Sequence, residues 1–195
     1  MALQERPFGP TSGAASVANQ IPLNTQGNQV PNPLPATQNI VSTAETLILA
    51  PSNPTVALSI AIPPDTQLEQ VPFDISASGY IKTTASGTVT LSLYSGTTIV
   101  SGNLLKASSA VTQNSATAPF WIKAKLIYDS VSGKLAGTVD FYINGTVVAS
   151  ATVANVITGI NNTNTPVVQF CLTITSSGAG AGTPTTINVK AFSAG

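Results

Sequence analysis

Apolar and polar residues alternate along much of the chain after residue 45. In residues 88–94 the alternation places Val89, Leu91 and Leu93 on one side. A period of two is typical of a half-buried β-strand, because successive side chains point to opposite faces of a sheet. The same period, or a β-branched composition, predicts further strands at 46–49, 55–60, 73–81, 103–108, 134–143, 146–150, 167–175 and 186–192.

The alternation is clearest in residues 120–128. One face of this predicted strand is apolar and is expected to point into the core: Phe120, Ile122, Ala124, Leu126 and Tyr128. The other face carries Trp121, Lys123 and Lys125. Because Trp is enriched in interface hot spots, these three residues are a candidate subunit contact. The alternative is that Trp121 is an aromatic covered locally on an outer sheet face.

Turn signals separate the predicted strands. Asn144-Gly145 is a strong hairpin signal, since both central residues of a type I′ turn need a positive φ. Residues 51–54 and 129–133 also read as turns, and Gly79 marks a possible bulge. The pattern predicts eight to ten strands and no helix. We therefore expect an all-β fold, an antiparallel jelly-roll-like β-sandwich, over residues 39–195.

Proline divides the chain. Of the 14 prolines, 11 lie in residues 1–72, and residues 1–38 show no helical or strand period. These residues are predicted to form an extended arm, for which a disordered tail is the alternative. The arm is almost uncharged and carries widely spaced apolar residues, which suits a strap laid across a partner. The expected anchors are Leu3, Phe8, Val17, Ile21, Leu23, Val30 and Leu34.

Charge is scarce throughout the chain. Charged residues make up 7% of it, with seven basic and seven acidic side chains. No basic patch indicates nucleic-acid binding, and no apolar run is long enough to cross a membrane. The first residues do not resemble a secretory signal, so synthesis in a cytoplasm is expected. A neutral surface offers little repulsion between copies, which favours a subunit of an assembly.

Catalytic and metal-binding patterns are missing from the sequence. There is no His, and the single cysteine, Cys171, reads as a small strand residue. Zinc, calcium and phosphate-loop motifs are likewise missing, so no cofactor is expected. A carboxylate pair of the glycosidase kind remains possible, but no spacing singles one out. Each of the candidate acids has an ordinary structural role: Glu45, Asp65, Glu69, Asp74, Asp129 and Asp140.

Residues 70–195 resemble structural proteins of tailed bacteriophages, in particular capsid decoration (cement) proteins. The resemblance is carried by FDISASGY (73–80), LSLYSGT (91–97), APFWIKA (118–124) and DSVSGKLAG (129–137). It implies a non-enzymatic protein on the capsid exterior of a virion, bound to the major capsid protein. It also implies a homo-oligomer, commonly a trimer and sometimes a dimer. The arm would staple this subunit to capsid or to neighbouring copies.

Two other classes of function are compatible with a β-sandwich. A receptor- or glycan-binding module of a tail fibre or adhesin would need several exposed aromatic residues. The chain has 11 aromatics, most of them on predicted core faces. A carbohydrate-active enzyme is disfavoured, because no carboxylate pair stands out.

Overall fold

The computed structural model of the chain describes residues 36–51, 53–61, 72–113, 116–129, 134–156 and 169–194. The seven predicted anchors of the arm, Leu3 to Leu34, lie outside these residues. The first described strand begins at Ala36, so it includes the last three residues assigned to the arm.

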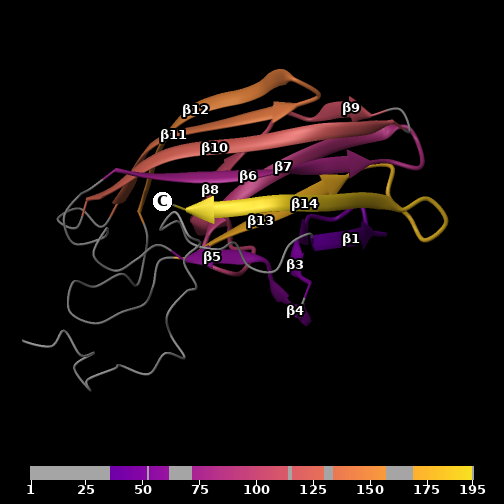
Figure 1. Cartoon of the computed structure of the whole chain (residues 1–195), viewed down its shortest axis with the longest axis horizontal. Helices are drawn as coiled ribbons and strands as arrows, with labels where there is room; N and C mark the ends of the chain where they lie inside the picture. Colours follow the sequence, from indigo (N-terminus) through magenta and orange to yellow (C-terminus); the bar gives the residue numbers. More distant parts are fainter. Residues whose placement is uncertain are drawn as a thin grey trace, which may run out of the picture. The chain divides into compact units, whose positions relative to one another are not determined.

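The described residues form an antiparallel β-sandwich, which confirms the predicted fold class. Its first sheet has six strands, and the C-terminal strand lies inside it, between the strand that begins at Ala36 and the one that begins at Phe73 (Figure 1). In spatial order the strands are β1 (Ala36–Ile40), β14 (Thr185–Ala194), β6 (Phe73–Lys82), β10 (Thr117–Asp129), β11 (Lys134–Ile143) and β12 (Thr146–Val156).

The second sheet contains the shorter strands. Its main path is β2 (Thr46–Leu47), β13 (Gln169–Ser176), β7 (Gly87–Ser95) and β8 (Leu104–Ala107). Beside β13 lies β5 (Ser59–Ala61), and beside β7 lies β9 (Val111–Gln113). A separate pair is formed by β3 (Leu49–Ala50) and β4 (Asn53–Ala57). A short 3-10 helix, η2 (Ser101–Asn103), precedes β8.

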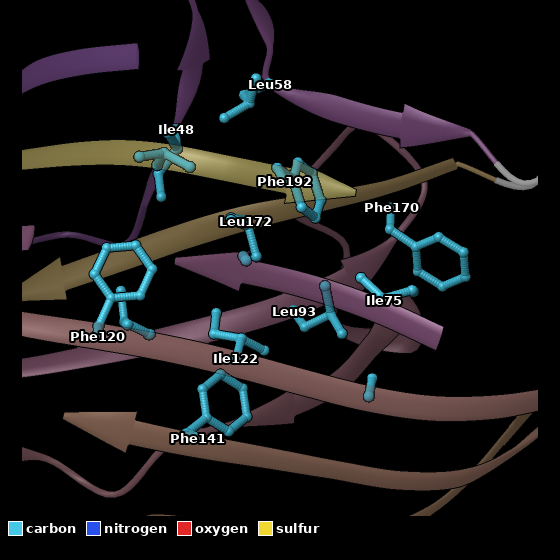
Figure 2. Close-up of a cluster of buried hydrophobic side chains, with 14 of the residues drawn as sticks. Ile48, Leu58, Ile75, Leu93, Phe120, Ile122, Phe141, Phe170, Leu172 and Phe192 are labelled. Atoms are coloured by element: carbon cyan, nitrogen blue, oxygen red, sulfur yellow. The ribbon is translucent and has the colours of Figure 1, made fainter. Parts of the chain in front are cut away.

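The two sheets pack face to face through their apolar sides. Phe73 of β6 and Phe170 of β13 meet across the core with ring centroids 6.0 Å apart. Burying a phenylalanine or leucine side chain stabilises the fold by roughly 1.5–3 kcal/mol. Figure 2 shows part of this cluster, whose labelled members are Ile48, Leu58, Ile75, Leu93, Phe120, Ile122, Phe141, Phe170, Leu172 and Phe192.

The predicted alternation holds in the long strands. In β10, Phe120, Ile122, Ala124 and Leu126 are buried, while Trp121, Lys123 and Lys125 are exposed. The predicted core face of β7 is also buried, and in β11 the alternation places Leu135, Val139, Phe141 and Ile143 in the core. The Asn144-Gly145 hairpin joins β11 to β12 with φ of 53° and 79°, as a type I′ turn requires.

The predicted bulge at Gly79 is wrong. Gly79 pairs in unbroken register with Phe120 on β10, and the register shift lies on β14, between Val189 and Ala191. The glycine is needed for close approach: a Cβ there would lie 2.0 Å from the carbonyl oxygen of Asn188. Because Gly79 has no side chain, β14 can approach the backbone of β6 closely, and β6 itself carries no bulge.

Two predicted strands are each divided by a buried residue. Residues 46–49 become β2 and β3, and residues 55–60 become β4 and β5. Ile48 and Leu58 interrupt these strands, and both are fully buried. The Ile48 N–H donates to the Leu172 carbonyl, and the Leu58 N–H donates to the Ile48 carbonyl. The backbone changes its pairing partner at these residues. Strand β4 also begins at Asn53, inside the predicted 51–54 turn.

Candidate functional site

The solvent face of the first sheet carries a row of apolar side chains across four neighbouring strands. Trp121 on β10 is opposite Tyr142 on β11, and Tyr142 is opposite Val147 on β12. On the other side of β10, Pro119 is opposite Tyr80 of β6. We call Tyr80, Pro119, Trp121, Tyr142 and Val147 the aromatic row.

The row is accessible to solvent. Tyr80, Trp121 and Val147 are 48%, 41% and 53% exposed, whereas Pro119 and Tyr142 are half-buried. Trp121 cannot turn inward, because both of its neighbours in β10, Phe120 and Ile122, occupy the core. Trp121 therefore lies on the outer face of the sheet, where 41% of its surface is exposed among the described residues.

The two lysines continue the same face along β10. Lys123 Nζ lies 6.0 Å from the centroid of the Tyr142 ring, within the range of a cation–π interaction. Lys123 is opposite Asp140 on β11, and Lys125 is opposite Asp74 on β6. Each lysine therefore faces a carboxylate on an adjacent strand, and this end of the face is electrically balanced.

Toward β1 the same face is largely polar. Ser76 and Ser193 share a hydrogen bond of 2.8 Å, and Thr186 Oγ1 donates to Asn39 Oδ1 at 2.9 Å. Asn188 Nδ2 donates to Thr37 Oγ1 at 2.7 Å. The Oδ1 atom of Asn188 is buried and has no donor among the described residues. The face is thus apolar over β10 to β12 and amide- and hydroxyl-rich over β14 and β1.

A second cluster lies on the side of the second sheet that faces away from the core. The Glu45 carboxylate accepts hydrogen bonds from Tyr94 at 2.9 Å and from Thr173 at 2.5 Å. Cys171 and Tyr94, which are opposite each other, complete the cluster and are almost fully buried.

Ionisation in this cluster is suppressed. Burial raises the pKa of the Cys171 thiol to about 12, with a smaller contribution from the Glu45 charge. Burial also raises the pKa of Tyr94 to about 12, helped by its hydrogen bond to Glu45. A thiol held neutral in this way is a poor nucleophile, in keeping with the structural role predicted for Cys171.

The sequence placed Trp121, Lys123 and Lys125 together on one face, and the structure confirms that placement. The prediction omitted Tyr80 and Tyr142, which complete the aromatic row. Tyr142 could have been found from the alternation of residues 134–143, since it lies between two apolar residues, Phe141 and Ile143, that are both buried. Tyr80 could not be linked to Trp121 without the pairing of β6 with β10.

Within the described residues, no group of three or more His, Cys, Asp or Glu side chains could hold a metal ion. Nor does any helix in those residues have the length and apolar content needed to cross a bilayer.

No family model and no curated protein matches the chain. Three solved structures are similar to it. Lectin I-B4 from Griffonia simplicifolia in a metal-free form is 12% identical, with 90% of this chain and 86% of that chain covered and a TM-score of 0.26. Lectin UEA-II complexed with galactose is 11% identical over 88% and 89% of the two chains, with a TM-score of 0.26. Peanut lectin with a nine-residue peptide is 11% identical over 88% of each chain, with a TM-score of 0.22. TM-scores this low do not establish a common fold, so nothing about this chain is drawn from these lectins.

Proposed function

We propose that the protein is a non-enzymatic structural subunit of a bacteriophage virion that decorates and stabilises the capsid exterior. Its partners are the major capsid protein and further copies of itself, arranged as a trimer or a dimer. The arm, residues 1–35, binds capsid or neighbouring subunits, and the solvent face of the first sheet supplies a second contact. Neither nucleic acid nor membrane is among its partners.

The observation that carries this proposal is the composition of the solvent face. Trp121 and Tyr80 stand exposed beside lysines that are opposite carboxylates, among neutral hydroxyl and amide side chains. Exposed aromatic residues with a polar surround are typical of a protein contact. The phage assignment itself is supported by the resemblance of residues 70–195 to decoration proteins.

Binding to expanded phage capsids that lack the protein tests the proposal. A chain lacking residues 1–35 keeps all of β1 and is expected to lose most of its occupancy on these capsids. Charge reversal on the face, Lys123→Glu with Lys125→Glu, should lower the occupancy further. A matched control is Lys190→Glu, which changes an exposed lysine on β14 outside the aromatic row. Full occupancy of the truncated chain would disprove the role of the arm.

A glycan-binding module of a tail fibre or adhesin is the second candidate. It is favoured by the same row, because the exposed rings of Tyr80 and Trp121 offer apolar faces on which a sugar ring could stack. A glycan array separates the two functions. Saturable binding that is lost in Trp121→Ala, together with no binding to capsids, would replace the decoration proposal.

A further inference from the structure

Strand β12 forms one edge of the first sheet, and no described strand pairs with its outer side. It has 11 residues, whereas β1 at the other edge has five. Residues 146–156 contain no charged residue, no proline and no glycine. Proteins usually protect a sheet edge with a short strand, a lysine, a proline or a bulge, because its unpaired main-chain groups attract other strands. Most of β12 has none of these features, which indicates an edge that another strand covers.

The edge is closed at one point near its start. Val148 is left out of the register between β11 and β12, and its carbonyl accepts a hydrogen bond of 3.3 Å from the Ser109 N–H. From Ala149 to Val156 the register with β11 is unbroken. The open part of the edge is therefore residues 149–156.

The pairing of β11 shows which residues of β12 point outward. The Asn144 N–H donates to the Pro119 carbonyl on β10. Alternate residues of a strand in an antiparallel sheet bond to opposite neighbours, so the even-numbered residues of β11 bond to β10 and the odd-numbered ones to β12. Ser150, Thr152 and Ala154 are opposite even-numbered residues of β11. Their own N–H and C=O groups therefore point toward the open side.

We infer that β12 pairs antiparallel with β12 of a second copy, across a two-fold axis at Thr152. In this arrangement Thr152 is opposite the partner subunit's Thr152, and Ser150 is opposite the partner subunit's Ala154. Each outward residue exchanges two main-chain hydrogen bonds with its partner, which gives about six in all. The first sheets of the two copies join into one continuous sheet.

A second copy is the occupant that the chemistry of this edge favours. Pairing across a two-fold axis brings like residues together, so a charge near the axis would be repelled by its own counterpart. The open part of β12 is uncharged, and Thr opposite Thr is a favourable cross-strand pair. The edge of the second sheet at β8 lacks these properties, because that strand has four residues and contains Lys106.

The pairing leaves the proposed binding face free. Tyr80 and Trp121 lie on β6 and β10, and β11 separates β10 from the paired strand. Because the two Thr152 side chains project from the same face of the joined sheet, both aromatic rows face the same side. The inference specifies the contact between copies, so it rests on that part of the proposed function, and it selects a dimer over a trimer.

Sedimentation velocity of the full chain, without capsids, tests the pairing. We expect a dimer of two 19.8 kDa chains. Thr152→Lys puts like charges directly opposite each other at the axis and should raise the dimer dissociation constant by about tenfold or more. The matched control, Thr37→Lys, changes an exposed threonine on β1 and should leave the dimer unaltered. A monomer or trimer of the unsubstituted chain, or an equally stable dimer of Thr152→Lys, would overturn the inference.

Amide hydrogen exchange measured by NMR locates the contact without a substitution. The N–H groups of Ser150 and Thr152 should exchange as slowly as that of Ala151, which bonds to β11 in either state. Fast exchange of Ser150 and Thr152 in the dimer would overturn the inference, as would slow exchange in a monomer, because another part of the same chain would then cover the edge. Protection that appears only after capsids are added would identify a capsid strand as the occupant instead. The first two outcomes leave capsid binding intact, since occupancy on capsids measures it separately.

Discussion

The Tyr94 hydroxyl donates a hydrogen bond of 2.9 Å to the Glu45 carboxylate, and this contact fastens the segment before β2 to the second sheet. The other carboxylate oxygen of Glu45 accepts from Thr173 on β13. One acidic side chain therefore joins three parts of the chain that are far apart in sequence. Glu45 is half-buried, so the loss of one donor leaves its carboxylate partly desolvated and the contact is costly to break.

Removing the Tyr94 hydroxyl should destabilise the domain. Tyr94→Phe leaves one oxygen of Glu45 without its donor, so we expect a loss of about 1–2 kcal/mol in the free energy of unfolding. The matched control is Tyr80→Phe, whose ring is half exposed on the other sheet and which should change stability by less than about 0.5 kcal/mol. Urea denaturation of both variants measures the difference. Equal effects would show that the Glu45 contact contributes nothing.

Stability should fall at alkaline pH. In the folded protein the pKa values of Cys171 and Tyr94 are raised from 9.0 and 10.0 to about 12. As pH rises above these ordinary values, the unfolded chain loses protons that the folded chain keeps, which favours unfolding. The stabilisation is complete below about pH 9 and disappears as pH approaches 12.

Melting temperatures measured from about pH 8 to about pH 11 would show this decline. The double variant Tyr94→Phe/Cys171→Ala lacks both groups, so its melting temperature should fall less steeply over that range. Parallel pH profiles for the two proteins would contradict the prediction.

Neighbouring residues of β10 should differ sharply in their effect on stability. Phe120 is fully buried, so Phe120→Ala should cost about 3–5 kcal/mol, as large cavities do. Trp121 is 41% exposed, and Trp121→Ala should cost about 1 kcal/mol or less. Chemical denaturation measures both. A larger cost for Trp121 than for Phe120 would mean that the register of β10 is shifted by one residue.

Substitution of Gly79 should be among the most damaging changes in β6. A Cβ at this position would lie 2.0 Å from the Asn188 carbonyl oxygen and 2.9 Å from Phe120 Cε1. The carbonyl belongs to the paired strand β14, so relief requires the strands to separate, and Gly79→Ala should cost about 3 kcal/mol or more. The control is Gly102→Ala, where no atom lies within 4 Å of the added methyl group. A soluble, fully stable Gly79→Ala variant would refute the close approach.

The boundary between arm and domain can be located by truncation. Removing residues 1–35 leaves β1 whole, so the melting temperature should stay close to that of the full chain. Removing residues 1–38 also removes Gln38, whose side chain donates to the Leu47 carbonyl at 3.1 Å and accepts from the Leu49 N–H at 2.9 Å. The longer deletion should therefore melt at a lower temperature. Equal melting temperatures for the two deletions would place the boundary after Gln38.

Local features of the fold were predictable from the sequence. The side-chain alternation of β10 and the Asn144-Gly145 turn depend on neighbouring residues only, so periodicity and turn chemistry reveal them. The exposure of Trp121 and the lysines follows from the same alternation. Only the part of this face that β10 contributes could be predicted, because its other members come from β6, β11 and β12.

Features that depend on pairing between distant strands were not predictable. Nothing local marks Ala36–Ile40 as a strand, since its hydrogen bonds come from β14, near the other end of the described chain. Gly79 has the local signature of a bulge, and only the approach of Asn188 shows its actual role. The sequence likewise gives Glu45 only an ordinary structural role, because its hydrogen-bond partners, Tyr94 and Thr173, are distant in the chain.

The internal position of β14 has a consequence for synthesis of the protein. Both of its partners, β1 and β6, precede it by at least a hundred residues and have no other way to complete the pairing between them. A ribosome that stalls after Lys82 and before Thr185 releases a chain in which β1 and β6 lack the strand that lies between them, and such open edges pair readily with other chains. Incomplete copies should therefore be recovered as aggregates or be degraded, and only complete copies would be available for assembly.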